Sequence, residues 1–160
     1  MIVVSNATPL IGLAKVNHLD LLQDLFGVII IPQTVYDEVV THAPNRPGAA
    51  EIRQATWIQT QTPTDPTKVA YLRADLDPGE AEALVLAEEL AADWLLLDEP
   101  KARLAARLVG LNFVGTVGLL LLAKQTGKIA AIRPLLDELK VQKFHLSDKV
   151  YQAALNQAGE

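Results

Sequence analysis

The chain has 160 residues, of which half are hydrophobic and about a fifth are charged, a composition typical of one soluble globular domain spanning residues 1–160. It contains no cysteine, which excludes disulfides and thiolate metal sites. The net charge of −5 is unevenly distributed, because residues 1–99 carry fifteen acids and five bases whereas residues 100–160 carry nine bases and four acids. An acidic region beside a basic one could hold a cation and still attract a polyanion.

The N-terminus lacks the basic start and cleavage site of a signal peptide. The longest apolar run, Phe113 to Ala123, is about half the roughly 20 residues that a membrane span needs. We therefore expect a cytoplasmic protein without a membrane segment.

Short apolar runs typical of buried strands alternate with helical patterns along the chain. The runs predict strands at 2–4, 28–31, 94–97 and 112–114, and a weaker one at 57–61. Helices are expected after Pro9 and at 18–26, 32–40, 79–90, 100–109, 116–125, 132–141 and 147–158, with loops at 43–48 and 60–67. This alternation predicts an α/β domain with a mainly parallel sheet.

Polar residues follow two of the expected strands. The first strand ends at Ser5 and Asn6, and the strand at 94–97 is followed by Asp98 and Glu99. Parallel sheets bind ligands at the carboxyl ends of their strands, so these residues are candidates for a site. Asp98 or Glu99 could equally be a simple helix cap, since Pro100 suits the first turn of the next helix.

Two helices contribute further acids. The apolar stripe of the helix at 79–90, extended back by one turn, reaches Glu80, and Glu82 lies on its flank. The helix dipole favours an acid anywhere in that turn, so it does not explain the inward position of Glu80. In the helix at 32–40, Asp37 and Glu38 flank the apolar arc symmetrically, and spacing alone does not choose between them.

Carboxylates gathered without partners repel one another, and a divalent cation would neutralise them. Oxygen ligands without His or Cys favour Mg²⁺ or Mn²⁺. Such an ion can activate a water for attack on phosphorus and stabilise the leaving oxygen, which is the chemistry of a nuclease or a phosphatase.

A basic group follows the strand at 94–97. It consists of Lys101, Arg103 and Arg107, and the two arginines share one helical face. These residues could steer RNA phosphates, or they could form an ordinary solvated face. The apolar segment 117–122 is expected in the core, although such helices also form dimer interfaces.

Six segments together, in order and nearly end to end, resemble a PIN domain: VVSNATPLIGLA, VIIIPQTVYDEVV, LDPGEAEALVLAEEL, LLLDEPKARLAARLVGL, FVGTVGLLLLAKQTG and IRPLLDELKVQKFHLSDKVYQAALNQAGE. The resemblance implies a three-layer α/β/α fold in which three or four acids hold Mg²⁺ or Mn²⁺. Many PIN domains are toxins of toxin–antitoxin pairs and cut RNA.

The resemblance also implies where the site lies. It places the family's first acid at Asn6, the second at Glu38, the helix acid at Glu80 with Glu82 as a second candidate, the last pair at Asp98 and Glu99, and nearby hydroxyls at Thr8 and Thr116. We expect Glu38, Glu80 and Asp98 to hold the metal together with Asn6, and the accessory candidates are Thr8, Glu82, Glu99 and Thr116.

Asn6 departs from the family pattern. Its amide oxygen can ligate Mg²⁺ but brings no negative charge and cannot act as a general base, so weaker metal binding is expected. The predicted function is a metal-dependent ribonuclease with a depleted acidic site, acting on RNA, with a small antitoxin partner and a homodimeric state. The alternative is a catalytically inactive PIN protein that binds RNA or a protein. A phosphatase is disfavoured because the acidic nucleophile after the first strand is missing.

Overall fold

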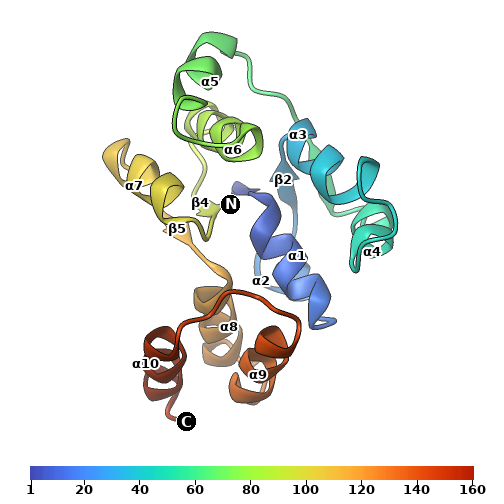
Figure 1. Cartoon of the computed structure of the whole chain (residues 1–160), viewed down its shortest axis with the longest axis vertical. Helices are drawn as coiled ribbons and strands as arrows, with labels where there is room; N and C mark the ends of the chain where they lie inside the picture. The colour runs from blue at the N-terminus through green and yellow to red at the C-terminus, as the bar shows by residue number, and fades with distance from the viewer.

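The computed structural model describes residues 1–160 and contains one sheet of five parallel strands in the order β3-β2-β1-β4-β5 (Figure 1). The strands are β1 (Val3–Ser5), β2 (Ile29–Ile31), β3 (Ile58–Thr60), β4 (Trp94–Leu96) and β5 (Phe113–Val114). All five lie within one or two residues of the strands expected from the sequence, and the α/β class is confirmed.

Helices cover both faces of the sheet and give the three-layer α/β/α architecture. They are α1 (Ala7–Lys15), α2 (Leu21–Phe26), α3 (Gln33–Tyr36), α4 (Ala49–Gln54), α5 (Pro66–Leu72), α6 (Pro78–Glu89), α7 (Pro100–Leu108), α8 (Thr116–Gln125), α9 (Arg133–Val141) and α10 (Asp148–Ala158), with a π-helical turn η1 (Asp37–Thr41) directly after α3. Figure 1 shows α8, α9 and α10 together at one end of the molecule, opposite α5 and α6.

The alternation of side chains along the strands divides the core in two. Val3 and Leu96 belong to the larger cluster, which includes residues from α1 to α4 and from α8 to α10. Val4 and Leu95 belong to the smaller cluster, which is closed by α6 and α7. Successive residues of a strand point to opposite faces, so these short apolar runs must be covered on both sides.

Two short helices were not predicted. The segment 60–67 was expected to be a loop, but α5 begins at Pro66, with the Asp65 side chain accepting a hydrogen bond from the Lys68 N–H at 3.1 Å. No residue of α5 is fully buried, and only Val69 and Leu72 pack against the smaller core cluster. α4 has only six residues, too few for a periodic signal.

The expected helix at 32–40 has a change of winding in its middle. Gln33 to Tyr36 are α-helical, whereas Asp37 to Thr41 form a π-turn in which the His42 N–H donates to the Asp37 carbonyl at 2.8 Å. Val39 and Val40, which are buried, anchor this turn to the core. Such wide turns are rare and occur frequently at functional sites.

The connections reverse direction beside β1. From β1 the chain proceeds through β2 to β3 on one side, then crosses to β4 and β5 on the other. A crevice at this kind of reversal, at the carboxyl ends of the strands, is where open parallel sheets bind ligands. No helix has the length and apolarity that a bilayer crossing requires.

Candidate metal centre

Asn6 lies at the centre of this edge of the sheet. Its backbone N–H donates to the Leu96 carbonyl at 3.0 Å, which joins the end of β1 to the end of β4. The residue is buried, yet its side chain does not cap α1. The amide oxygen Oδ1 instead faces the start of α6, because a β-carbon on Gly79 would lie 3.4 Å from it. Capping of α1 therefore does not explain why an asparagine stands at this position.

Glu80 is buried at the start of α6 and forms a capping box with Asp77. The Glu80 N–H donates to Asp77 Oδ1 at 2.8 Å, and the Asp77 N–H donates to Glu80 Oε1 at 3.0 Å. Burial raises the pKa of Glu80, and the charges of Asp77, Glu99 and Glu38 raise it further, whereas the hydrogen bond from the Asp77 backbone lowers it. Glu80 thus has a structural role as well as a place among the acids.

Glu38 comes from the π-turn and belongs to the same group of charges. Although the residue is exposed at the surface, partial burial of its carboxylate raises its pKa. The charges of Asp77 and Glu99 raise that pKa further, and Arg46 opposes them.

The neighbouring acid, Asp37, is engaged within its own helical segment. Its Oδ1 accepts hydrogen bonds from Gln33 Nε2 at 3.1 Å and from Thr41 Oγ1 at 3.0 Å. Of the two acids that sequence spacing left undecided, Glu38 is the one whose charge raises the pKa of Glu80.

Asp98 and Glu99 follow β4 but have different surroundings. Asp98 accepts two bonds from Thr116, from its N–H at 2.9 Å and from its hydroxyl at 2.8 Å. Arg103 Nη2 lies 3.8 Å from Asp98 Oδ1. Burial raises the pKa of Asp98, whereas the Thr116 hydrogen bonds and Arg103 lower it. Both oxygens of Asp98 are thus occupied by protein donors.

Glu99 has an uncommitted oxygen. Its Oε1 accepts a hydrogen bond from the Thr8 hydroxyl at 2.7 Å, which links the start of α7 to the start of α1. Its Oε2 is buried and has no hydrogen-bond partner. The negative charge of Glu99 raises the pKa of both Glu38 and Glu80. A buried oxygen without a donor is costly, and a bound cation is one way to satisfy it.

A family model described as a PIN domain matches residues 2–160. The chain belongs to the PIN-domain family. PIN domains are generally nucleases and generally use divalent metals. No curated protein matches the chain.

In this PIN domain the acids are neighbours, but they do not form a ready cage. No three side chains of the Asp, Glu, His or Cys type lie close enough together to hold one ion in common. Like charges avoid one another, and the raised pKa values of Glu38 and Glu80 record that repulsion together with burial. The donors are carboxylate and amide oxygens, which suit a hard divalent cation.

The basic residues after the PIN-domain acids are only partly free. Arg103 Nε donates to the Leu97 carbonyl at 2.9 Å, and its guanidinium lies 5.5 Å from the centre of the Phe113 ring. Arg107 lies against the same ring, also at 5.5 Å. Lys101 is exposed at the start of α7. The ion pair, the hydrogen bond and the ring contact together hold the Arg103 guanidinium beside Asp98.

Gly115 explains why Arg103 can reach this position. A β-carbon there would lie 1.9 Å from Arg103 Nη2 and 2.6 Å from Asp98 Oδ1. The absence of a side chain makes room for the guanidinium beside Asp98. Glu82, the second helix acid implied by the resemblance, instead accepts a hydrogen bond from the Thr34 hydroxyl and joins α6 to α3.

Sequence reasoning missed two charged residues near the PIN-domain site, Asp77 and Arg46, both of which act on the pKa of Glu38. Asp77 could have been recognised from the sequence, because Asp-Pro-Gly-Glu matches a capping box with proline in the first turn. Arg46 lies in the expected loop at 43–48 and has no comparable pattern.

Proposed function

We propose that this PIN domain is a divalent-metal-dependent ribonuclease with a depleted acidic site. The observation that supports it most is the buried Glu99 Oε2, which has no hydrogen-bond partner and lies within the electrostatic reach of Glu38 and Glu80. A cation at this edge of the sheet would satisfy the free oxygen and relieve the repulsion among the acids.

Glu99 Oε2 would be a direct ligand of Mg²⁺ or Mn²⁺. Because no three acids lie close enough to share one ion, Glu38, Glu80 and the neutral oxygen of Asn6 would act on it through coordinated waters. When bound, the ion would neutralise charge on the substrate phosphate and lower the pKa of a coordinated water. The protein's own part is to fix these oxygens: the capping box holds Glu80, and Thr8 holds one oxygen of Glu99.

This assignment differs from the sequence-based one in the last pair of acids. Asp98 was expected to bind the metal, with Glu99 as an accessory. Because Thr116 and Arg103 occupy both Asp98 oxygens, we assign Asp98 to positioning and Glu99 to the ion. Asp98 would fix the start of α8 through Thr116, and α7 through Arg103, behind the site.

A second candidate function is a PIN domain without catalytic activity that binds RNA or a protein. The observation that favours it is Asn6, because the site has one carboxylate fewer than the family pattern and hard cations depend on ligand charge. The two candidates differ in whether metal binding is accompanied by cleavage.

The test is Asn6→Asp, compared with wild type and with Glu99→Gln. Without metal, an aspartate at this buried position adds like charge and should lower the melting temperature. With Mn²⁺ it should give a larger rise in melting temperature and faster cleavage of a single-stranded RNA. Glu99→Gln should reduce the Mn²⁺ response. If Mn²⁺ shifts all three proteins equally and none cleaves RNA, the metal site is refuted and the binding module is preferred.

The toxin role and the small antitoxin partner remain predictions from the family resemblance. Induced expression in a bacterial host should arrest growth if the protein is a toxin. Glu38→Gln should abolish that arrest, because it removes an acid of the proposed metal site without altering a hydrogen bond of the fold. Equal growth of both strains would contradict the toxin role.

A further inference from the structure

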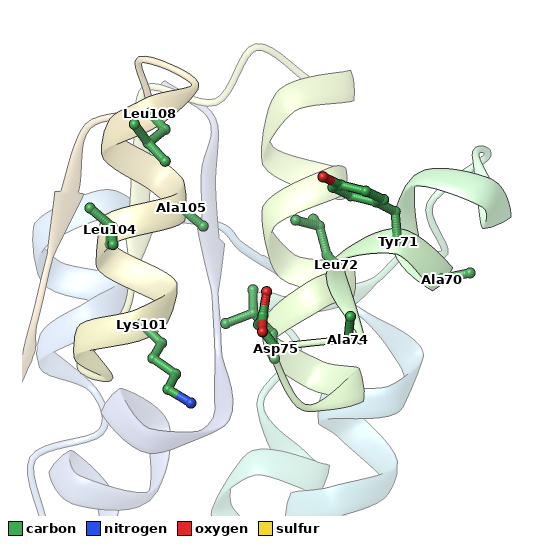
Figure 2. A pocket seen from close by; sticks show the side chains of 10 residues that line it. Ala70, Tyr71, Leu72, Ala74, Asp75, Lys101, Leu104, Ala105 and Leu108 are labelled. Carbon is green, nitrogen blue, oxygen red and sulfur yellow. The ribbon is translucent and has the colours of Figure 1, made fainter.

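A groove with a volume of about 610 Å³ lies between α5 and α7. Figure 2 shows α7 with Lys101, Leu104 and Leu108 on one side and α5 with Tyr71 on the other. The lining is mainly hydrophobic, and Lys101 and Asp75 are its charged members. The volume falls within the range of about 300–1,000 Å³ that is usual for ligand sites.

Two residues that line the groove are close in sequence to acids of the proposed metal site. Lys101 is two residues after Glu99 on the first turn of α7, and Asp75 is two residues before Asp77, which caps α6. In Figure 2 Lys101 and Asp75 lie toward one end of the groove and Leu108 toward the other. From Lys101 to Leu108 the helix rises by about 10 Å, so the groove leads away from the acids along α7.

Three large apolar side chains of this groove, Tyr71, Leu104 and Leu108, are exposed to solvent. Tyr71 is 82% exposed and Leu108 79% exposed, and Leu104 lies between Lys101 and Leu108 on the same helix. α5 contributes no fully buried residue to the core. Apolar side chains gathered in one exposed place typically mark a binding surface.

The chemistry of the groove matches a nucleic-acid strand that continues from the acidic site. A strand cut at one phosphate extends beyond it on both sides, and its next bases need an apolar or aromatic surface. An exposed tyrosine can stack on any base, and a lysine near the site can contact a phosphate. The bases of a duplex are already stacked and paired, so only a single strand can offer them to Tyr71.

We propose that the groove between α5 and α7 binds the bases of single-stranded RNA next to the phosphate at the acidic site, with Tyr71 as a stacking platform and Lys101 as a phosphate contact. This inference rests on the proposed function, because the acids define where the strand enters. It adds that this protein recognises unpaired RNA through a surface outside the metal site.

The test is equilibrium binding of fluorescein-labelled oligoribonucleotides, followed by fluorescence anisotropy in chelator, so that no cleavage occurs. Wild type is compared with Tyr71→Ala and with Tyr71→Phe, which keeps the ring. Val141→Ala is the matched control, because Val141 is 71% exposed on α9. Tyr71→Ala should weaken binding of the single strand about tenfold, the order of one lost base stack. Tyr71→Phe, Val141→Ala and wild type should bind alike, and the matched duplex should bind more weakly.

Three results would overturn the proposal. Equal affinity of Tyr71→Ala and wild type would exclude stacking in the groove, whereas the Mn²⁺ response of Glu99→Gln would still test the metal site separately. A duplex that binds as tightly as the single strand, with the same dependence on Tyr71, would exclude recognition of unpaired bases. If Leu108→Asp changes the molecular mass measured by light scattering and leaves RNA affinity unchanged, the groove is an interface between copies of the chain.

Discussion

Replacement of Thr116 by valine isolates one hydrogen bond behind the acidic site. Thr116 is fully buried, and its hydroxyl donates to Asp98 Oδ2 at 2.8 Å. Valine has nearly the same shape, so the Thr116 N–H can still donate to Asp98 Oδ1, as it does at 2.9 Å in the wild type. The substitution therefore removes a donor from a carboxylate and leaves the packing almost unchanged.

The size of the effect follows from the surroundings of Asp98. Its side chain is only 19% exposed, so water cannot easily replace the lost hydroxyl. A hydrogen bond to a charged group contributes about 1.5–3 kcal/mol, and we expect Thr116→Val to lower the free energy of unfolding by about 2 kcal/mol at pH 7. For a chain of this size that loss corresponds to a fall in melting temperature of about 4–8 °C.

The effect should depend on pH with a defined sign. Burial raises the pKa of Asp98 in the folded protein, and the Thr116 hydroxyl opposes that rise. A carboxyl group with a raised folded pKa favours folding at low pH and loses that contribution as the pH rises through the folded value. Thr116→Val removes a donor that stabilises the charged form, so its cost should be largest at pH 7 and shrink as Asp98 becomes protonated.

The assay is urea unfolding followed by circular dichroism at pH 7 and pH 4.5. Thr126→Val is the matched control, because the Thr126 hydroxyl bonds to the Leu122 carbonyl of its own helix, at 2.8 Å and at an exposed position. The control should change stability by less than about 0.5 kcal/mol. A Thr116→Val protein within that same margin of wild type at pH 7 would refute the account of Asp98 as a carboxylate held by Thr116.

Three further predictions concern separate parts of the chain. In chelator, Glu38→Gln should raise the melting temperature at pH 7, because it removes a carboxylate whose pKa is raised in the folded protein. At lower pH the increase in melting temperature should shrink, because Glu38 of the wild type becomes protonated. Glu160 accepts hydrogen bonds from Lys124 and from the start of α9, which lower its pKa to about 2. Glu160→Gln should therefore melt below wild type at pH 7, with the difference fading as the pH falls from 4.5 toward 2. Gly115→Ala should cost about 1–3 kcal/mol in urea unfolding, because its β-carbon would displace Arg103 and crowd Asp98 Oδ1. Part of that cost should disappear in an Arg103→Ala background, and an undiminished cost there would contradict the role of Arg103.

The sequence predicted the elements whose apolar pattern is strong. The strands were found because they are short apolar runs, and Glu80 was located by extending the stripe of its helix. α5 was missed because it is short and only Val69 and Leu72, both partly buried, pack against the core. Local pattern thus identifies an element most readily where several of its residues are buried.

The pair Asp98 and Glu99 shows a different limit. Both acids follow the same strand, and nothing local distinguishes them. The difference arises from partners far along the chain, since Thr116 occupies Asp98 and Thr8 reaches Glu99 across 91 positions. Such pairings depend on how the helices after β1, β4 and β5 meet at one edge of the sheet. Asn6 was correctly placed at that edge, but its failure to cap α1 required the structure.

The π-turn at Asp37–Thr41 makes the acidic site vulnerable to the loss of one amino acid. A π-turn contains one residue more than an α-turn, so a chain shortened by one residue between Glu38 and Thr41 could continue as an ordinary α-helix. The flanking segments would keep their orientation, because the wide turn is what absorbs the extra residue. The deletion would remove either Val39 or Val40, so one buried anchor would be lost and the wide turn that carries Glu38 would close. A single-codon deletion would thus change the backbone beneath this acid while the helix that carries it remained folded.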